Sequence, residues 1–441
     1  MKTGSNTVVY LVTGSSPNDR VQKVAQLREH FHNLTLVRRP GSAQQGDDAA
    51  LVVNPIPNPV GLLRRAGLDR SATVLDRVFF PNTAILYAKA VERRLRREIA
   101  ADLNDGREVC LITCAPPHAV CMAGLKLKER YPRIKWIVDW QDLWSYDENY
   151  YLQVPKFYRP RVRRVEAEIL RSADVNITTN THARRVLEER YAADRVVAIP
   201  HHFSRAEFLD DQREARVSTE STDRPITIGF LGTLFKPPRV PGELLVDTIR
   251  QLRRSGNNVE LHVHGGVPAV LEQDSVRLGQ DGIKLHGYTT HAAGIKMLAR
   301  YDFLLLLLAD LPNSKAVMSI KLPHYILANR PILAVVPEQS AVAEIVRETG
   351  TGVVISAESD WTEQLKRALA AERASELPIR NEAAIERFSW DHISREWLTA
   401  ICSTPDSTKT MERSVTLSAP AHPFVPLKSR PCEKTVGPCS H

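Results

Sequence analysis

The order of apolar and polar positions in the first half of the chain predicts a parallel sheet. An apolar, β-branched run at residues 7–13 is followed by a polar loop at 14–19, helical periodicity at 20–31 and a second apolar run at 34–37. This order is typical of a strand, a crossover helix and a parallel strand. Helical stretches also separate the next predicted strands, which lie at 108–113, 135–139, 174–178 and 195–199. The alternation predicts a doubly wound α/β domain over residues 1–205.

A second domain of the same kind is predicted in the other half of the chain. A polar stretch interrupts the alternation, and we expect an interdomain linker at residues 206–224. The alternation then restarts, with predicted strands at 226–231, 259–264, 284–286, 303–308, 332–335 and 352–355. We therefore expect a second Rossmann-like domain over 225–385. Apolar residues at helical spacing predict a terminal helix within 386–402, whereas the Pro-, Ser- and Thr-rich segment 403–441 is typical of disorder.

Two such domains also predict where a ligand binds. In open α/β sheets, ligands bind beyond the carboxyl ends of the strands. Two facing sheets therefore place the predicted site in the cleft between the domains, with its residues on the loops that follow the strands.

Composition narrows the class of protein. The 441 residues are 43% hydrophobic and 25% charged, which is ordinary globular composition and enough chain for two cores, so a single small binding module is excluded. The six cysteines show no metal-site spacing. The longest apolar stretch, residues 303–309, is far shorter than the roughly 20 residues that span a bilayer. No signal-like apolar segment opens the sequence, and the expected location is the cytoplasm.

The charge balance predicts an anionic partner. A net charge of +8 and a pI near 9.2 suit a nucleotide, a phospholipid surface or a nucleic acid. Basic runs at 93–97 and 159–164 fit either solvated helix faces or peripheral contact with an anionic inner membrane face. Nucleic acid is not expected, because no stacking aromatic side chains alternate with these charges.

Motifs in the second half occur in an order that resembles one enzyme family. They are IGFLGTL at 228–234, HVHGG at 262–266, HGY at 286–288 and KLPHYILANRPILA at 321–334. Together they resemble the nucleotide-sugar half of the family 4 retaining glycosyltransferases. DWQDLW at 139–144 and FSWD at 388–391 resemble further segments of that family. The resemblance covers residues 5–402 and implies a GT-B fold, in which two Rossmann-like domains face each other across a cleft and a C-terminal helix crosses back to the first domain.

The glycine turns form the first part of the predicted nucleotide-sugar site. Gly232 with Thr233, and Gly265 with Gly266, stand at predicted strand ends, where backbone N–H groups can replace the hydration of a diphosphate. The alternative interpretation is ordinary tight-turn chemistry.

Cationic residues complete the predicted phosphate contacts. The resemblance implies that Arg239 and Lys236 are catalytic and neutralise the departing diphosphate, so that no metal is required. Their alternative is a solvated loop pair. Ser319 and Lys321 open the next predicted helix, from which their backbone and side chains can meet the phosphates or the nucleoside.

The sequence departs from the family at two positions. The resemblance implies a glutamate that binds the nucleotide ribose where this chain has His324, and a partner glutamate eight residues earlier where it has Ala316. A neutral imidazole accepts one hydrogen bond and donates another, so we predict that His324 contacts the nucleotide. The alternatives are a surface histidine and a weakened or non-catalytic relative.

Three residues of the first domain are predicted to bind the acceptor. Asp139 and Asp142 stand at a predicted strand end beside Trp144, where carboxylates can hold acceptor hydroxyls and an aromatic face can stack on a sugar. The alternatives are a helix N-cap for Asp142 and a buried Trp144. His118 follows another strand and is a weaker candidate, with a helix-capping or solvent-facing histidine as its alternative.

These observations predict a glycosyltransferase that moves a sugar from a nucleotide diphosphate sugar to a glycan or lipid-linked acceptor. Retention of anomeric configuration and independence from metal are what the resemblance implies, and the nucleotide sugar is the expected co-substrate with no other cofactor. Sugar epimerases and phosphorylases share such folds, but their catalytic carboxylates or cofactor lysine are not evident. A second alternative is a non-catalytic protein that binds sugar nucleotide or serves as a partner subunit.

Overall fold

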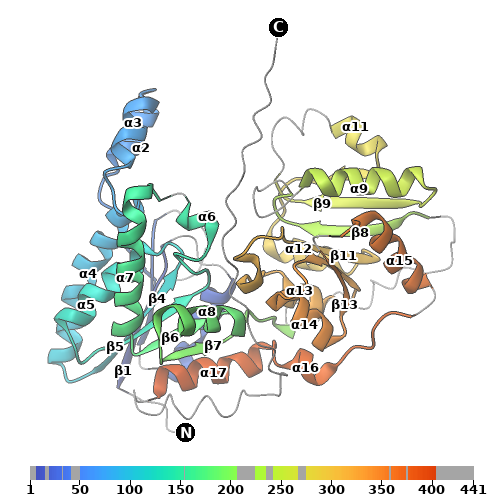
Figure 1. The fold of residues 1–441 in the computed structure, drawn as a ribbon. Helices are drawn as coiled ribbons and strands as arrows, with labels where there is room; N and C mark the ends of the chain where they lie inside the picture. Colours follow the sequence, from blue (N-terminus) through green and yellow to red (C-terminus); the bar gives the residue numbers. More distant parts are fainter. Residues whose placement is uncertain are drawn as a thin grey trace.

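The protein folds into two α/β domains (Figure 1). The computed structural model describes residues 6–14, 19–31, 33–40, 50–152, 154–205, 224–234, 242–266, 275–356, 359–373 and 376–403. Most of the predicted linker 206–224 and of the predicted tail 403–441 therefore lies outside the described residues.

The first domain is built on a seven-stranded parallel sheet in the order β3-β2-β1-β4-β5-β6-β7. Its strands are β1 (Thr7–Val12), β2 (Asn33–Arg38), β3 (Ala50–Val52), β4 (Glu108–Ala115), β5 (Lys135–Trp140), β6 (Val175–Thr178) and β7 (Val196–Ala198). Its helices are α1 (Asp19–Ala25), η1 (Gln26–His30), α2 (Pro59–Arg65), α3 (Asp69–Asp76), α4 (Ala84–Asn104), α5 (Ala119–Arg130), α6 (Glu148–Tyr151), η2 (Lys156–Tyr158), α7 (Arg159–Ser172) and α8 (Thr181–Tyr191). The strand order reverses between β1 and β4, which marks the switch point where such sheets bind ligands.

The second domain contains a six-stranded parallel sheet in the order β10-β9-β8-β11-β12-β13. Its strands are β8 (Ile226–Leu231), β9 (Val259–His264), β10 (Ile283–Leu285), β11 (Phe303–Leu307), β12 (Ile332–Val336) and β13 (Gly352–Ser356). The helices of this half are α9 (Gly242–Arg254), α11 (Ser275–Gln280), α12 (His291–Leu298), η4 (Ser314–Ala316), α13 (Leu322–Leu327), α14 (Ala341–Thr349), α15 (Trp361–Arg373), α16 (Glu382–Glu386) and α17 (Trp390–Cys402).

Alternate residues of the central strands pack into cores on opposite faces of each sheet. On β1, Val8 and Val12 pack in the core that contains residues of α4, α5 and α7, whereas Val9 and Leu11 pack on the other face. Full burial of one such side chain contributes about 1.5–3 kcal/mol. Because both faces are covered, the strands carry continuous apolar runs, which is why the sequence pattern located them.

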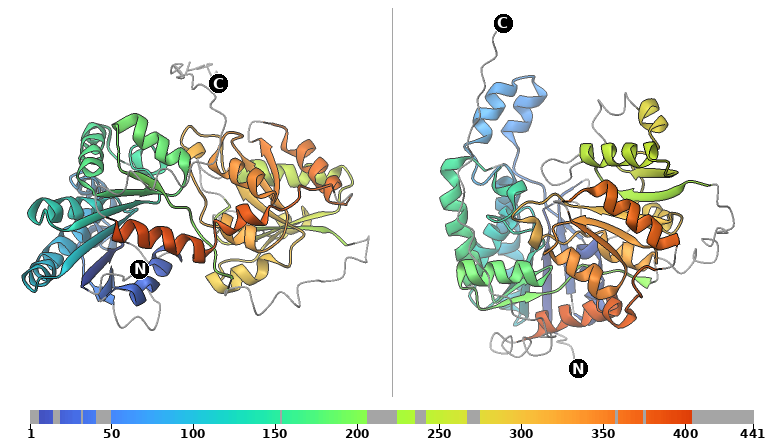
Figure 2. Two further views of the ribbon diagram at one scale, coloured as in Figure 1. Left: turned by 90° about the horizontal axis from the view of Figure 1, so that it is seen from below. Right: turned by 45° about the vertical axis from the view of Figure 1, so that its right-hand side comes forward.

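The terminal helix α17 returns to the first domain. Its residues Trp397 and Ile401 pack in the same core as Val9 of β1, and Figure 2 shows the helix lying along that domain. Where the chain crosses, Phe203 N donates to Phe388 O at 2.9 Å and Trp390 N donates to Phe203 O at 2.8 Å. The predicted fold class, two facing Rossmann-like domains with a returning helix, is confirmed.

Differences from the predicted elements are local. The strand predicted at 284–286 is Ile283–Leu285, so His286 follows the strand. The pattern did not predict β3 or the pair α2 and α3, because three to eight residues carry too little periodicity to stand out. Among the described residues, no helix combines the length and apolarity that crossing a membrane requires.

Candidate nucleotide-sugar and acceptor site

Two glycine turns meet at the carboxyl ends of β8 and β9. Gly232 N donates to His264 O at 2.8 Å, and Leu234 N donates to Gly266 O at 3.3 Å. Gly232 and Gly265 have φ angles of 117° and 152°, and a Cβ on Gly265 would lie 2.2 Å from Gly232 O. Only glycine permits this backbone approach. The predicted turns are therefore adjacent, and Thr233 is exposed beside them.

A lysine side chain lies over the first turn. A Cβ on Gly232 would lie 2.5 Å from Lys321 Nζ, and this ammonium lies 4.7 Å from the ring centre of Phe230. Lys321 N donates to Ser319 Oγ at 3.4 Å, which fixes the start of the segment. The fold therefore brings the predicted residues Gly232, Ser319 and Lys321 together at one edge of the sheet. A fixed positive charge beside a glycine turn is an arrangement that holds phosphate oxygens.

His324 lies inside the second domain rather than on its surface. Its side chain is 4% exposed, and its Nδ1 lies 3.2 Å from Ile320 O. The surface-histidine alternative is therefore wrong, while contact with a nucleotide stays a prediction. The next residue, Tyr325, is fully buried and its hydroxyl accepts from Leu231 N at 3.0 Å, which ties α13 to the end of β8.

An exposed tyrosine stands at the second turn. A Cβ on Gly266 would lie 2.3 Å from the Tyr288 hydroxyl oxygen, and the Tyr288 side chain is 83% exposed. Tyr288 belongs to the HGY motif, but no role was predicted for it. Its position offers an aromatic face beside the predicted phosphate contacts.

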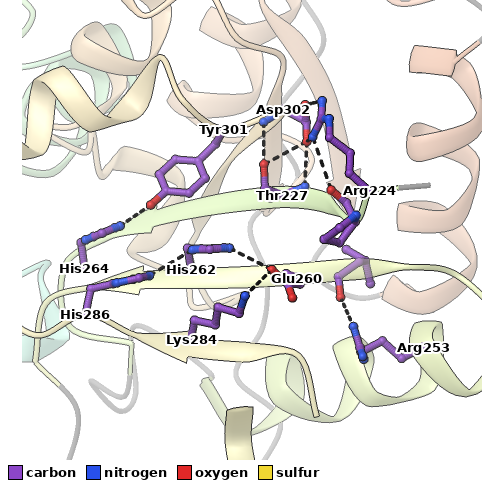
Figure 3. A network of polar contacts seen from close by, with 12 residues as sticks. Arg224, Thr227, Arg253, Glu260, His262, His264, Lys284, His286, Tyr301 and Asp302 are labelled. Carbon is purple, nitrogen blue, oxygen red and sulfur yellow. Dashed lines mark hydrogen bonds and ion pairs between the residues drawn. The ribbon is translucent and has the colours of Figure 1, made fainter. Parts of the chain in front are cut away.

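A polar ladder on β9 and β10 leads to this turn (Figure 3). His262 Nδ1 lies 3.0 Å from His286 Nε2, the rings of His264 and His286 stack at 4.4 Å, and His264 hydrogen-bonds to the Tyr301 hydroxyl. At the far end, Glu260 pairs with Lys284 at 2.8 Å. Burial is the main cause that lowers the pKa of all three histidines. Within the described ranges, no three His, Cys, Asp or Glu side chains are grouped as metal ligands.

Both carboxylate oxygens of Asp139 are engaged inside the first domain. Arg20 donates to Asp139 through Nη2 at 2.9 Å and through Nε at 3.0 Å, and Gln141 Nε2 donates to it at 3.0 Å. Arg20 also donates to Pro200 O at 2.8 Å and lies 5.1 Å from the ring centre of Trp397. This buried pair joins β5, α1 and α17, and acceptor contact by Asp139 stays a prediction.

Asp142 and His118 belong to an aromatic cluster. Tyr150 donates its hydroxyl to Asp142 Oδ2 at 3.1 Å, and His118 Nε2 lies 3.0 Å from Asp142 O. The His118 ring stacks on Trp144 at 5.2 Å, and Trp144 is buried as its alternative interpretation predicts. His118 is 4% exposed, so the solvent-facing alternative is wrong. Burial lowers its pKa to about 4, which keeps the ring neutral at physiological pH.

The two domains meet beside this cluster. Asn180 Nδ2 donates to Ala316 O at 2.9 Å, and Tyr146 donates its hydroxyl to Pro312 O at 2.8 Å. A small open pocket is lined from both domains, with Asp142 and Tyr146 on one side and Val317 on the other. The predicted catalytic residues, Lys236 and Arg239, lie outside the described residues.

Part of the chain matches a known family. Residues 225–371 match the family model described as Glycosyl transferases group 1. No curated protein sequence matches the chain.

The fold of the whole chain is similar to solved glycosyltransferase structures. A glycosyltransferase from Rickettsia africae superposes with a TM-score of 0.57 and 11% identity, covering 91% of this chain and 100% of that one. Sucrose-phosphate synthase from Thermosynechococcus elongatus gives 0.56 and 14%, covering 92% and 98%. WaaG, a glycosyltransferase involved in lipopolysaccharide biosynthesis, gives 0.56 and 15%, covering 93% and 100%.

At these identities the similar structures show the fold alone, and the family match covers the second domain. The resemblance to glycosyltransferases that the motifs predict is thereby confirmed: residues 225–371 match the group 1 glycosyltransferase model, and the whole chain has a GT-B fold.

Proposed function

We propose that the protein transfers a glycosyl group from a nucleotide diphosphate sugar to a glycan or lipid-linked acceptor, with retention of configuration and without a metal. The observation that carries the proposal is the position of the Lys321 ammonium directly over the Gly232 turn, where β8 ends in the matched domain. Retention and metal independence are extended from the family resemblance of the motifs.

The phosphate contacts provide the main catalytic effect in this proposal. As the bond between sugar and diphosphate breaks, negative charge grows on the departing oxygen. A positive charge fixed in advance stabilises that growing charge without reorganisation. Lys321 provides such a charge, and we propose that Lys236 and Arg239 add theirs from the segment that follows the Gly232 turn. His324 accepts a hydrogen bond from a ribose hydroxyl.

The acceptor enters from the first domain. We propose that Asp142 orients acceptor hydroxyls, because it stands in the pocket that both domains line and carries a hydrogen bond from Tyr150. Closure of the two domains around the reactants excludes water that would otherwise hydrolyse the nucleotide sugar. The basic faces of the first domain suit an acceptor presented at an anionic inner membrane face.

Replacing Lys321 tests this function. Lys321→Ala should lower turnover of the accepted nucleotide sugar by roughly 10- to 150-fold, the value of one charge-assisted hydrogen bond. The substrate is first found by measuring transfer and hydrolysis with a panel of nucleotide sugars. Lys366→Ala, at an exposed position of α15, is the matched loss of one lysine and should leave turnover unchanged. Equal turnover in both variants would remove Lys321 from the site.

A second candidate function is a non-catalytic protein that binds sugar nucleotide. The observation that favours it is Ala316, which stands where the family resemblance implies a glutamate and whose carbonyl accepts from Asn180 of the first domain. Thermal-shift titration that detects a nucleotide sugar, combined with no transfer and no hydrolysis of that same compound, would select this function.

A further inference from the structure

A pair of short helices extends from the first domain. Figures 1 and 2 show α2 and α3 standing beyond the rest of that domain. Gly67, with φ of 73°, joins them, and Leu68 N donates to Leu63 O at 2.9 Å. Among the described side chains of residues 59–76, only Val60 and Ala72 are buried. Helices this short are marginal in water without a packing partner.

Large apolar side chains are exposed on this pair. Leu62 is 58% exposed, Leu68 is 51% exposed, and Val74 and Val78 are each 66% exposed. Phe157, on η2, is also 66% exposed. Most of the large apolar side chains that are exposed in the described part of the chain therefore belong to residues 59–78 and 152–164. Soluble proteins seldom leave such groups together unless the surface binds something.

The two segments form one surface, which we call the hairpin surface (residues 59–78, 152 and 154–164). Tyr158 donates its hydroxyl to Val78 O at 3.3 Å, which joins η2 to the residues after α3. The rings of Phe80 and Tyr158 meet edge to face at 5.1 Å, and the Arg161 guanidinium lies 4.3 Å from the ring centre of Phe80. These contacts hold the start of α7 beside the end of the hairpin.

The charge of the hairpin surface is strongly positive. Asp69 and Asp76 are its acidic residues, and residues 152–164 contain none. Its basic residues are Arg64, Arg65, Arg70, Arg77, Lys156, Arg159, Arg161, Arg163 and Arg164. The other basic run, residues 93–97, lies on α4 instead, and Arg94 pairs there with Glu98 at 2.8 Å, as on a solvated helix face.

We propose that the hairpin surface docks on an anionic phospholipid bilayer, with the exposed apolar side chains entering the boundary of the acyl chains and the arginines lying among the headgroups. A bilayer is the partner that supplies both an apolar layer and dense negative charge in one plane. Docking is separate from transfer chemistry, so it can be measured without a nucleotide sugar. The outcome of that measurement does not depend on whether the proposed function is correct.

A second copy of this chain is a poorer occupant. In a symmetric dimer the same surface meets itself, so the nine basic residues named above would face their own copies. Like charges brought together in this way oppose association. Charge complementarity therefore favours lipid over self-association.

Vesicle co-sedimentation of the full chain tests the proposal. The probes are vesicles of phosphatidylcholine alone and of phosphatidylcholine with phosphatidylglycerol in a roughly 7:3 ratio. We expect binding to the anionic vesicles only, weakened by added salt. Arg64→Gln with Arg65→Gln should lower partitioning by roughly 30-fold, because each basic residue near such a surface contributes about 1 kcal/mol. The matched control, Arg254→Gln with Arg300→Gln, removes two exposed arginines of the second domain and should bind like the wild type.

A second pair of variants tests the apolar contribution. Leu62→Ser with Val74→Ser should also lower partitioning, whereas Leu244→Ser with Val276→Ser, exposed in the second domain, should not. Circular dichroism of each variant verifies that it is folded. Wild-type protein that ignores anionic vesicles, or equal binding by hairpin and control variants, would overturn the proposal. If the wild type does not bind vesicles but forms a dimer in light scattering, and Leu62→Ser with Val74→Ser abolishes that dimer, the surface binds a second copy of the chain instead.

Discussion

His264 stands immediately before the Gly265 turn and is 3% exposed. Burial, followed by repulsion from His286 and His262, lowers its pKa to about 4. The ring is therefore neutral at physiological pH and hydrogen-bonds to the Tyr301 hydroxyl. Protonation would place a charge beside two further imidazoles, those of His262 and His286. The protonation state of His264 consequently affects the geometry of the turn that follows it.

Acid should destabilise the protein through His264. In the unfolded chain the histidine binds a proton near pH 6.5, whereas the folded protein resists protonation until about pH 4. A lowered folded pKa means that the stabilisation is complete above the unfolded pKa and is lost as pH falls toward the folded one. When the pH falls from about 7.5 to about 4.5, the free energy of unfolding should therefore decrease by about 1–3 kcal/mol less in His264→Gln than in the wild type.

Urea unfolding at both pH values measures this difference. Two other buried groups also make stability depend on pH: the pKa of His118 is lowered to about 4, and burial raises the pKa of Glu396 to about 7. Each contributes equally to the wild type and to His264→Gln, so both contributions cancel when the two proteins are compared. His30→Gln, at an exposed position, is the control and should behave like the wild type. An identical decrease in unfolding free energy on acidification of His264→Gln and of the wild type would contradict the lowered pKa of His264.

At the scale of elements, the turns after β8 and β9 act as one unit. The backbone of each turn bonds to the other, and glycine is required where they approach. Gly265→Ala should therefore displace Gly232 and cost about 1–3 kcal/mol of stability, because a Cβ cannot fit and φ of 152° disfavours alanine. If the turns hold the diphosphate, affinity for the nucleotide sugar should fall with it.

Gly279 offers the matched control for this substitution. It lies on α11, and the space that an alanine methyl group would occupy there is open, so Gly279→Ala should stabilise the protein by about 0.4–1 kcal/mol. Thermal unfolding and titration with the accepted nucleotide sugar measure both effects. A Gly265→Ala protein with wild-type stability and affinity would show that the turns tolerate separation.

At the scale of the whole molecule, the apolar runs determined most of what could be predicted. Strands buried on both faces are visible as continuous apolar runs, so both sheets and the returning helix were predicted. The glycine turns and Lys321 were found because motif order places them at neighbouring strand ends. Arg20 was missed, since nothing local marks a pairing with Asp139 across 119 positions of sequence. Tyr288 and the hairpin surface depend on exposure, which a single sequence does not report.

Asn180 lies at the junction of the two domains. Asn180 has two roles, since its side-chain oxygen accepts from Ala183 N at 2.9 Å to cap α8 while its amide donates to Ala316 O of the second domain. Asn180→Asp preserves an acceptor for the cap, but it replaces the amide donor with an oxygen that repels the Ala316 carbonyl. Such a mismatch costs about 1–3 kcal/mol at a buried contact.

We expect Asn180→Asp to open the domains and slow transfer while leaving each domain folded. Small-angle X-ray scattering should give a larger radius of gyration than for the wild type, with far-UV circular dichroism unchanged. Asn381 caps another helix, α16, because its side-chain oxygen accepts from Ala384 N. Asn381→Asp is therefore the control and should change neither scattering nor transfer. Unchanged scattering in Asn180→Asp would mean that other contacts, such as the pair of His182 and Glu344 at 2.8 Å, are sufficient to hold the domains together.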